Sequence, residues 1–349
     1  MNIFAIDVGF GTTAVVDNIN GHDSSVRSFA SRAVPVSYGK RNALTGGVLQ
    51  ERESIVVRVD GIDYEVGPDV ADIGAASEVR TLNDSYITSS RYKALLLGAL
   101  AHCKFDYIDM LVGGLPISNL GRSDELKAMM IGKHKIGNRT IIVKDARVIP
   151  QPLGALMHFA KHRAHHEKSD MMAVLARKTW LTADPGYGTF DYLTCNGVVP
   201  DDSRSDAHPF GHGRILADCC EYLSQIFGFD INVEVVDKAF RTGSLNVFGH
   251  SYDFPGTSGD DISFDVTPII EKITSDAVDA MKNKVGNGVD IDEILVSGGP
   301  AELYLPAIEK AYPKHKVSLI DNHGVAVALG MGEIARQITG ALNRKVKVA

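Results

Sequence analysis

Apolar residues along this chain occur in short runs that glycine-rich turns separate, with longer stretches of helical spacing between them. Short apolar runs bounded by turn residues predict buried strands, and apolar positions three and four residues apart predict helices. Strands are expected at residues 3–6, 14–16, 54–59, 64–66, 108–112, 140–148, 180–183, 192–195 and 294–296. Helices are expected at residues 90–103, 122–131, 151–167, 214–227, 233–240, 269–285, 301–311 and 325–338. The mixture of strands and helices predicts an α/β fold.

Three stretches are expected to be loops. Residues 37–53 are glycine-rich and charged, residues 113–116 read Gly-Gly-Leu-Pro, and residues 201–208 are polar. Glycine and proline commonly end regular structure. We therefore expect the strand at 108–112 to end before Gly113, and residues 201–208 to be a mobile loop.

One short pattern occurs in both halves of the chain. Residues 7–12 read Asp-Val-Gly-Phe-Gly-Thr, and residues 184–189 read Asp-Pro-Gly-Tyr-Gly-Thr. Each copy follows an apolar run and precedes a β-type stretch that ends in Asn-Gly, at residues 20–21 and 196–197. Asn-Gly between β-type runs is a strong hairpin signal. The repeat predicts the same strand, turn and strand in both halves.

The residue types in this turn suit phosphate binding. Glycines let the backbone approach an anion closely and direct N–H groups at it, and the threonine adds a hydroxyl donor. The aspartates would repel bare phosphate, so they make sense if Mg²⁺ lies between, because Mg²⁺ is usually held by one or two carboxylates plus phosphates. Either copy alone could be an ordinary hairpin, but the match between the copies favours phosphate binding.

Other phosphate-binding and hydrolase motifs do not fit. The run Gly9-x-Gly11-x-x-Ala14 matches a dinucleotide fingerprint in spacing, but that fingerprint requires a helix after the turn and an acidic residue about 20 positions later. Here β-type residues follow the turn, and residues 28–30 contain no acid. The sequence also contains no G-x-x-x-x-G-K-[ST], G-x-S-x-G or H-E-x-x-H motif.

Two further segments could belong to a nucleotide site. Residues 297–300 read Ser-Gly-Gly-Pro between an apolar strand and a helix, where a phosphate or a flat ring can approach the backbone. A plain strand-to-helix turn would explain the same glycines. Gln151 lies between Pro150 and Pro152, and its amide could orient an attacking water or could simply belong to a turn.

The histidines give weaker signals. His162, His165 and His166 lie at the polar end of an expected helix, and metal binding there is not favoured. His208 and His212 flank a glycine-rich helix start, which could contact a base or could be a plain cap. Both interpretations of that segment stay open.

Length and composition limit the class of protein. A chain of 349 residues suits two α/β domains, and its net charge of −7 makes it a poor general DNA binder. The sequence has no apolar run long enough to span a membrane and no basic-then-apolar leader, so we expect a cytoplasmic protein without a membrane partner. No disulfide framework or metal motif is expected from the cysteines, which are Cys103, Cys195, Cys219 and Cys220.

Taken in order, the motifs resemble those of the actin/Hsp70/sugar-kinase superfamily. Residues 7–12 and 184–191 look like its two phosphate motifs, residues 150–155 like its first connecting motif, residues 297–300 like its adenosine motif and residues 325–338 like its second connecting motif. Within the superfamily, the chain looks most like the ParM/StbA bacterial actins that segregate plasmids, with archaeal actin-like proteins close.

The resemblance implies an actin/Hsp70-like two-domain fold, in which duplicated ribonuclease H-like domains surround a nucleotide cleft. The first domain would comprise residues 1–180, with the C-terminal helix at 325–340 packing back onto it, and the second would comprise residues 181–324. The two domains would pack tightly around the shared cleft.

The resemblance also implies ATP or ADP and Mg²⁺ as ligands. Asp7 and Asp184 would hold the metal, through water, and Gln151 would place the attacking water, so these three are the expected catalytic residues. The expected nucleotide contacts are Gly9, Phe10, Gly11, Thr12, Thr13, Gly186, Tyr187, Gly188, Thr189, Asp191, Lys238, Arg241, Gly298, Gly299 and Pro300. Many members carry a lysine shortly after the first phosphate turn, but this chain has Thr13-Ala14-Val15 there.

The function implied first is a filament-forming ATPase that assembles head to tail and reaches plasmid DNA through a DNA-binding adaptor protein. A small-molecule kinase of the same superfamily, with Asp191 as its base, is a second possibility. A non-polymerising, nucleotide-gated binding protein is the third. The sequence does not decide between ATP and GTP, and it gives neither the filament architecture nor the identity of the adaptor.

Overall fold

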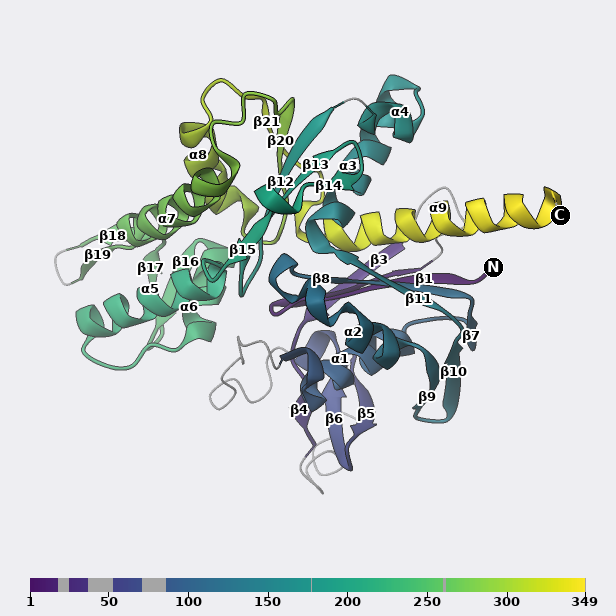
Figure 1. Ribbon diagram of the computed structural model, residues 1–349. Helices are drawn as coiled ribbons and strands as arrows, with labels where there is room; N and C mark the ends of the chain where they lie inside the picture. The colour runs from purple at the N-terminus through teal and green to yellow at the C-terminus, as the bar shows by residue number, and fades with distance from the viewer. Residues whose placement is uncertain (18–24, 37–52, 71–85, 177, 260–261, 349) are drawn as a thin grey trace. The chain divides into compact units, whose positions relative to one another are not determined.

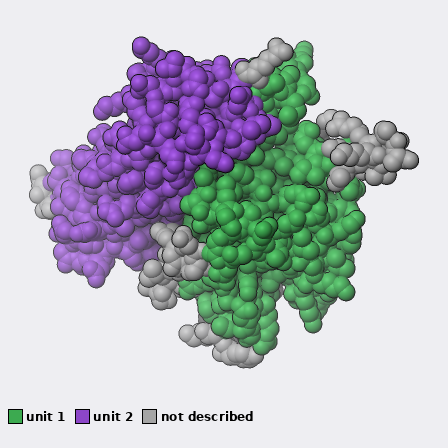
Figure 2. Space-filling model, viewed as in Figure 1, with its two compact units in different colours: residues 1–177, 320–349 green, residues 178–319 purple. Residues whose placement is uncertain are grey.

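The computed structural model describes residues 1–17, 25–36, 53–70, 86–176, 178–259 and 262–348. The chain forms two compact units, one from residues 1–177 with 320–349 and the other from residues 178–319 (Figure 2). We call them unit 1 and unit 2. The chain thus enters unit 2 once and returns to unit 1 once.

The central sheet of unit 1 has five strands in the order β11-β8-β1-β2-β3. β1 pairs antiparallel with β2 and parallel with β8, and β8 pairs parallel with β11. Two smaller sheets, β7-β10-β9 and β4-β6-β5, belong to the same unit. Their strands are β1 (Ile3–Val8), β2 (Thr12–Asp17), β3 (Ser25–Ala30), β4 (Val34–Pro35), β5 (Ile55–Val59), β6 (Ile62–Val66), β7 (Tyr107–Ile108), β8 (Met110–Leu115), β9 (Gly132–Ile136), β10 (Arg139–Val143) and β11 (Ala146–Pro150).

The central sheet of unit 2 repeats this arrangement. Its order is β14-β13-β12-β20-β21, with β15 also paired to β13. β12 pairs antiparallel with β13 and parallel with β20, and β20 pairs parallel with β21. The hairpins β16-β17 and β18-β19 complete the strands of the unit, which are β12 (Thr179–Pro185), β13 (Phe190–Asn196), β14 (Val199–Pro200), β15 (Asp206–His208), β16 (Ser244–Val247), β17 (His250–Asp253), β18 (Gly256–Ser258), β19 (Ser263–Asp265), β20 (Glu293–Val296) and β21 (Val317–Leu319). The duplication expected from the two turns is therefore present in the folded chain.

Helices pack against both central sheets (Figure 1). In unit 1 they are α1 (Ser90–Ala101), α2 (Ser123–Met130), α3 (Gln151–Glu167), α4 (Met171–Leu175) and α9 (Ala326–Val348). In unit 2 they are α5 (His212–Phe227), α6 (Val233–Thr242), α7 (Thr267–Val285) and α8 (Ala301–Ala311). Within the part of the chain that the structure describes, no helix combines the length and apolar character that a membrane span needs.

Local sequence signals set the helix ends. The Ser89 side chain accepts a hydrogen bond from the Tyr92 N–H at the start of α1, and Asn232 caps α6 in the same way. α5 and α6 both end at a glycine in the left-handed conformation, Gly228 and Gly243, where a side chain would be unfavourable. These caps explain why the helices expected from apolar spacing have nearly the observed bounds.

Alternation along β1 assigns its side chains to two faces. Phe4, Ile6 and Val8 join the apolar cluster that contains residues of α1. Asp7 has the opposite orientation, as Ala5 does, and α9 and α3 lie against the sheet elements there. The strand thus directs the Asp7 carboxylate toward the start of α3.

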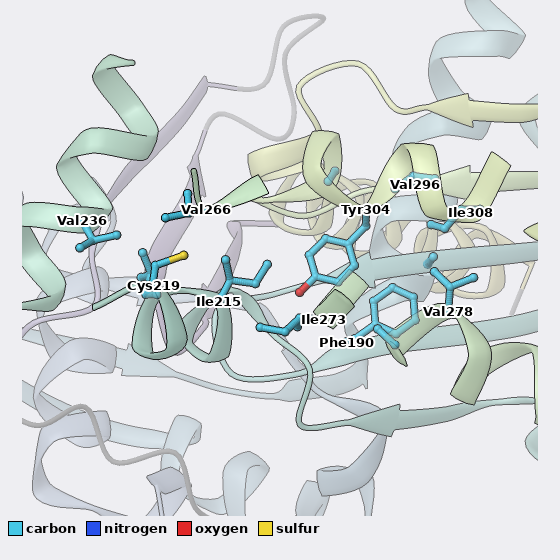
Figure 3. Packing of buried hydrophobic residues seen from close by; sticks show 14 of the residues in the cluster. Phe190, Ile215, Cys219, Val236, Val266, Ile273, Val278, Val296, Tyr304 and Ile308 are labelled. Atoms are coloured by element: carbon cyan, nitrogen blue, oxygen red, sulfur yellow. The ribbon is translucent and has the colours of Figure 1, made fainter. Parts of the chain in front are cut away.

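The core of unit 2 brings its central sheet together with its four helices. Figure 3 shows Phe190 of β13 beside Tyr304 of α8, with apolar side chains of α5 and α7 around them. The two rings stack with centroids 5.4 Å apart. The Tyr304 hydroxyl donates a 2.5 Å hydrogen bond to the Phe210 carbonyl, which holds the segment before α5 in place.

Two expectations about strands were wrong. β8 continues through Gly113 and Gly114 to Leu115 instead of ending before them. These glycines do not form a turn. A Cβ at Gly114 would lie 2.0 Å from Met331 Cε, so a side chain there would displace the end of Met331. Residues 140–148 do not form one strand, because they divide between β10 and β11, which belong to different sheets.

The polar segment 201–208 is also more ordered than expected. It contains β15, which pairs with β13 over Tyr192, Asp191 and Phe190. Ser205 Oγ accepts a 3.0 Å hydrogen bond from the Thr194 N–H, which fixes the segment to the sheet. The first Asn-Gly pair, at residues 20–21, and nearly all of the loop expected at 37–53 lie outside the described residues, whereas Asn196-Gly197 joins β13 to β14 as expected.

Candidate functional site

The first glycine turn, in unit 1, joins β1 to β2. The Gly9 N–H donates to the Thr12 carbonyl at 3.0 Å, closing a tight turn in which a Cβ on Gly9 would lie 3.0 Å from that same oxygen. Asp7 lies just before the turn and stands opposite Ala14 in the ladder. The carboxylate is therefore placed at the entrance of a turn that is half-buried, with Thr12 exposed.

Gln151 contacts Asp7 directly. Its Nε2 donates a 2.7 Å hydrogen bond to Asp7 Oδ1 across 144 residues of sequence. A carboxylate can only accept, so this contact fixes which end of the amide faces Asp7 and turns Oε1 away from it. Gln151 is the first residue of α3 and is mostly buried. The structure therefore brings together two of the three expected catalytic residues.

The aromatic residue of the first turn packs within unit 1. The Phe10 ring stacks on Tyr86 with centroids 4.6 Å apart, and Tyr86 meets Tyr92 edge-on at 5.4 Å. Tyr86 Oη also lies 3.5 Å from the Gly9 carbonyl. The ring of Phe10 thus anchors the turn to α1 and is not simply a surface residue.

The two threonines after the turn differ. Thr12 is exposed, whereas Thr13 is fully buried and its hydroxyl is 2.9 Å from Ser31 Oγ. The Gly11 carbonyl accepts from the Ser31 N–H at 2.9 Å. Of the two hydroxyls, that of Thr12 is accessible to a ligand, and that of Thr13 is used inside the unit.

The second glycine turn, in unit 2, has the same geometry. The Gly186 N–H donates to the Thr189 carbonyl at 2.7 Å, as Gly9 does to Thr12. The carboxylate before the turn, Asp184, stands opposite Asp191 in the β12–β13 ladder. Asp191 is almost completely buried and accepts a 2.5 Å hydrogen bond from the Thr189 hydroxyl. The repeated sequence has therefore folded into a repeated hydrogen-bonded turn.

Asp184 is a buried carboxylate. Only 8% of its surface is exposed, and Ser297 Oγ donates a 2.6 Å hydrogen bond to its Oδ1. Burial raises the pKa of Asp184 to about 6, because removal from water disfavours the charged form, and the Ser297 hydrogen bond opposes that rise only in part. A nearby cation would favour the ionised form.

The turn after β20 packs directly on this carboxylate. Gly298 has φ +94°, and a Cβ there would lie 2.1 Å from the Pro185 carbonyl and 3.0 Å from Asp184 Oδ1. A side chain is therefore excluded at Gly298. Gly299 has open space around its Cα, and Pro300 precedes the first residue of α8. Residues 297–300 thus pack directly against the second glycine turn and the carboxylate before it.

The start of α5 supports the second glycine turn. The His212 and Gly213 N–H groups donate to the Gly186 and Tyr187 carbonyls at 2.9 and 2.8 Å. A Cβ on Gly211 would lie 2.5 Å from the Tyr187 carbonyl, so the close approach requires glycine there. The segment thus supports the second glycine turn, a role that neither of the two open interpretations included, and base contact stays a prediction.

Lys238 and Arg241 lie on α6, away from the turn backbone. Both are exposed, and Arg241 forms an ion pair with Asp237 at 3.4 Å. The other oxygen of Asp237 lies 3.8 Å from His212 Nε2. Through Asp237, α6 thus contacts His212 at the start of α5. None of these contacts brings Lys238 or Arg241 to the carboxylate of Asp184.

The donor set fits a hydrated Mg²⁺ ion. No cluster of three or more histidine, cysteine, aspartate or glutamate side chains that could hold a metal ion occurs among the described residues. Mg²⁺ does not require such a cluster, since it keeps several waters and takes one or two carboxylates plus phosphate oxygens. Asp184 offers a hard oxygen ligand in a buried position, where a cation would offset the cost of burying its charge.

Sequence reasoning missed three supporting residues. Ser297 belongs to a recognised motif, but its hydrogen bond to Asp184 had no sequence signal. Gly114 leaves room for Gln151, because a Cβ there would lie 3.1 Å from Gln151 Cγ. Tyr86 supports Phe10 from a segment without any motif. All three act on residues far away in the sequence, which a pattern in one segment cannot show.

Comparison with known proteins identifies the fold. Residues 5–154 match the family described as the N-terminal domain of actin-like proteins. The sequence has no match among curated proteins.

Solved structures match nearly the whole chain. The archaeal actin homolog Ta0583 is 18% identical, with a TM-score of 0.70 over 97% of this chain and 100% of that one. A subunit of the 15-stranded ParM filament from Clostridium botulinum is 16% identical, with a TM-score of 0.72 over 97% of this chain and 100% of that one. Ta0583 has also been solved in complex with ADP. Residues 5–154 are therefore similar to the N-terminal domain of actin-like proteins, and the whole chain has the actin-like fold.

Proposed function

We propose that this protein is a filament-forming ATPase, which binds and hydrolyses ATP with Mg²⁺, assembles head to tail and drives plasmid DNA segregation through a DNA-binding adaptor protein. The observation that carries the proposal is the repeated turn. In each unit a hydrogen bond from a glycine N–H to a threonine carbonyl closes the turn. In each unit a carboxylate comes just before the turn, and a side chain of the same unit holds that carboxylate in place. Two turns of this kind suit the two ends of one phosphate chain.

Gln151 is suited to position the attacking water. Its amide nitrogen is bound to Asp7, and its Oε1 accepts no hydrogen bond from any residue that the structure describes. This oxygen would accept a hydrogen bond from the attacking water and so hold that water in place. Gln151 would contact the attacking water and not the bound nucleotide. Its contribution would therefore arise mainly in the transition state.

Asp184 is suited to organise the metal. Mg²⁺, when bound, would neutralise charge on the phosphates and on the transition state. The Ser297 hydroxyl fixes Oδ1 of the carboxylate, and Gly298 allows the following turn to approach it. The Asp7 carboxylate would act from unit 1 in the same way. The exposed Thr12 hydroxyl would donate to a phosphate oxygen, whereas the Gly186 N–H closes its own turn and would shape it. Gly298 and Gly299 would lie against the adenosine.

Fold similarity supports assembly into filaments. A ParM of similar fold forms a 15-stranded filament, and Ta0583 of similar fold binds ADP. A head-to-tail contact that does not close produces an open polymer. The net charge of −7 supports contact with DNA through an adaptor and not directly.

The kinase alternative is less well supported. It would require Asp191 to take a proton from a substrate hydroxyl. That carboxylate is 3% exposed and already accepts a hydrogen bond from Thr189. The non-polymerising alternative differs in its assembly alone, so light scattering after addition of ATP would separate it.

Hydrolysis by an Asp184→Ala variant tests the site. We expect its ATPase rate to fall at least about a hundredfold, which corresponds to about 2.7 kcal/mol of barrier, because a metal-organising carboxylate is lost. Asp276→Ala is the control, since Asp276 is an exposed carboxylate on α7 that pairs only with Lys272. Activity of the Asp184 variant within about threefold of wild type would show that the site is wrongly assigned.

A further inference from the structure

Two apolar side chains of unit 2 are unusually exposed. Val289 is 94% exposed and Phe248 is 82% exposed, the two largest values for big apolar residues within the described part of the chain. Single exposed apolar residues are common on soluble proteins. These two differ because the chain around each holds it in an outward position.

Phe248 forms the tip of the β16–β17 hairpin. Its φ is +48°, a backbone conformation that is unfavourable for a bulky side chain, and Gly249 follows it. The Phe248 ring touches Phe229 with centroids 4.5 Å apart, but most of it faces solvent. Folding of the monomer alone gains little from an aromatic residue at this position.

Val289 is presented by a rigid loop after α7. Tyr312 Oη donates to the Gly286 carbonyl at 3.1 Å, and His315 Nε2 lies 2.7 Å from the Gly288 carbonyl. These hydrogen bonds hold the residues before Val289, and after it the Asp290 carboxylate accepts a 2.6 Å hydrogen bond from Arg204. The valine is therefore pre-organised, so burying it in a contact would cost little conformational entropy.

The two side chains lie at opposite ends of α7. Ring contacts connect Phe248 through Phe229 and Phe227 to Phe264, which comes just before the first residue of α7. Val289 lies shortly after its last residue, Val285. A helix of 19 residues is about 28 Å long. Figure 1 shows α7 leading from the β18–β19 hairpin toward β20.

The charge of the chain differs between these ends. Residues 242–271, which include Phe248, contain five aspartates and glutamates and no lysine or arginine. Residues 282–292 and 310–316, which include and adjoin the Val289 loop, contain five lysines and two acids, Asp290 and Asp292. Lys284 and Lys316 pair with carboxylates of unit 2, whereas no ion pair joins Lys310 or Lys314 to any described residue.

We propose that the Phe248 hairpin of one copy packs against the Val289 loop of the next copy, as the apolar centre of a head-to-tail contact. The acidic surroundings of one end complement the basic surroundings of the other. The contact joins two different surfaces of the same unit, so it can repeat from one copy to the next, and an open polymer forms where the rotation between copies does not close a ring. This inference rests on the proposed self-assembly and names the surfaces that perform it.

Charge-introducing variants test the contact. Phe248→Asp and Val289→Asp each place a charge on one of the two surfaces of the proposed contact. Val199→Asp is the matched control, since Val199 is a 65% exposed residue of the same unit. We expect each of the first two to raise the critical concentration for assembly at least about tenfold, as loss of a central apolar anchor does. The control should assemble as wild type does. Thermal unfolding and nucleotide affinity should be unchanged in all three, because the substituted side chains are exposed.

Mixing the variants tests the pairing. An equimolar mixture of Phe248→Asp and Val289→Asp retains one intact pair of surfaces per two chains. We expect sedimentation velocity to show heterodimers in this mixture, without polymer, while each variant alone stays monomeric. A mixture that stays monomeric would overturn the pairing of these two surfaces.

The outcome separates this inference from the proposed function. If wild type assembles with ATP and both variants assemble as well as wild type, the contact is elsewhere and the ATPase filament stands. If wild type itself fails to assemble in every nucleotide state, the proposed self-assembly is refuted, and this contact with it.

Discussion

Replacement of Asp184 by asparagine should make the protein more stable while abolishing its activity. The carboxylate is 8% exposed, and its pKa is raised from 3.8 to about 6 by burial. Between these two values the folded protein binds more protons at Asp184 than the unfolded chain does. The free energy of unfolding therefore falls as the pH rises through this window.

The size of the effect follows from the shift. A displacement of about two units costs the folded state about 3 kcal/mol at pH 7.5, where Asp184 is ionised in both states. At pH 5 the cost is about half of that, since the folded carboxyl is then mostly protonated. Asparagine has nearly the same shape, carries no charge and can still accept the Ser297 hydrogen bond. Asp184→Asn should therefore gain about 3 kcal/mol at pH 7.5 and about half as much at pH 5.

Trp180 provides the assay. It is the one tryptophan of the chain, is fully buried and lies on β12 with Asp184, so its fluorescence reports unfolding of unit 2. Urea titrations of the protein free of nucleotide and metal, at both pH values, give the difference. Asp290→Asn is a control that should change the free energy of unfolding in the opposite direction. The hydrogen bond from Arg204 lowers the pKa of Asp290, so loss of this charge should reduce stability slightly at neutral pH.

An Asp184→Asn variant that is no more stable than wild type at pH 7.5 would refute the argument from burial. So would a gain that is the same at pH 5 and at pH 7.5. Either result would mean that the charge of Asp184 is compensated within the folded protein, and that its position does not require a cation.

Two further substitutions test neighbouring parts of the site. Gln151→Ala should lower the turnover rate at least about tenfold while ATP affinity stays within about threefold, because Gln151 would act on the attacking water alone. Single-turnover hydrolysis and equilibrium titration measure the two quantities, and equal losses in both would indicate a structural role. Gly298→Ala should destabilise unit 2 by at least about 2 kcal/mol, since its φ is +94° and a Cβ would meet the Pro185 carbonyl, whereas Gly299→Ala should be nearly neutral. Equal melting temperatures for the two glycine variants would contradict the close approach of this turn to β12.

The sequence predicted those parts of the site that depend on neighbouring residues. The two glycine turns, their flanking strands and the start of α3 at Gln151 all follow from local patterns of apolar, glycine and proline residues. The repeat also indicated that both units share a topology, which the matching strand orders confirm. The roles of individual residues toward a nucleotide stay predictions.

Contacts between distant segments could not be predicted in the same way. The glycines of β8 have the composition of a turn, but the pairing of β8 with β1 and β11 continues through them, and Met130 and Met331 pack over them. Thr13 looks equivalent to Thr12 in the sequence, yet pairing with Ser31 buries it. In both cases the partner comes from another element, and apolar periodicity does not carry that information.

Sedimentation with ATP and Mg²⁺, followed in the same sample as phosphate release, tests the central claim most directly. The claim predicts that wild-type protein pellets after ATP is added, stays assembled with a non-hydrolysable analogue, and returns to the supernatant as phosphate is released or when ADP replaces ATP. Protein that stays in the supernatant in all three nucleotide states, at concentrations well above micromolar, would contradict it and would favour the kinase alternative.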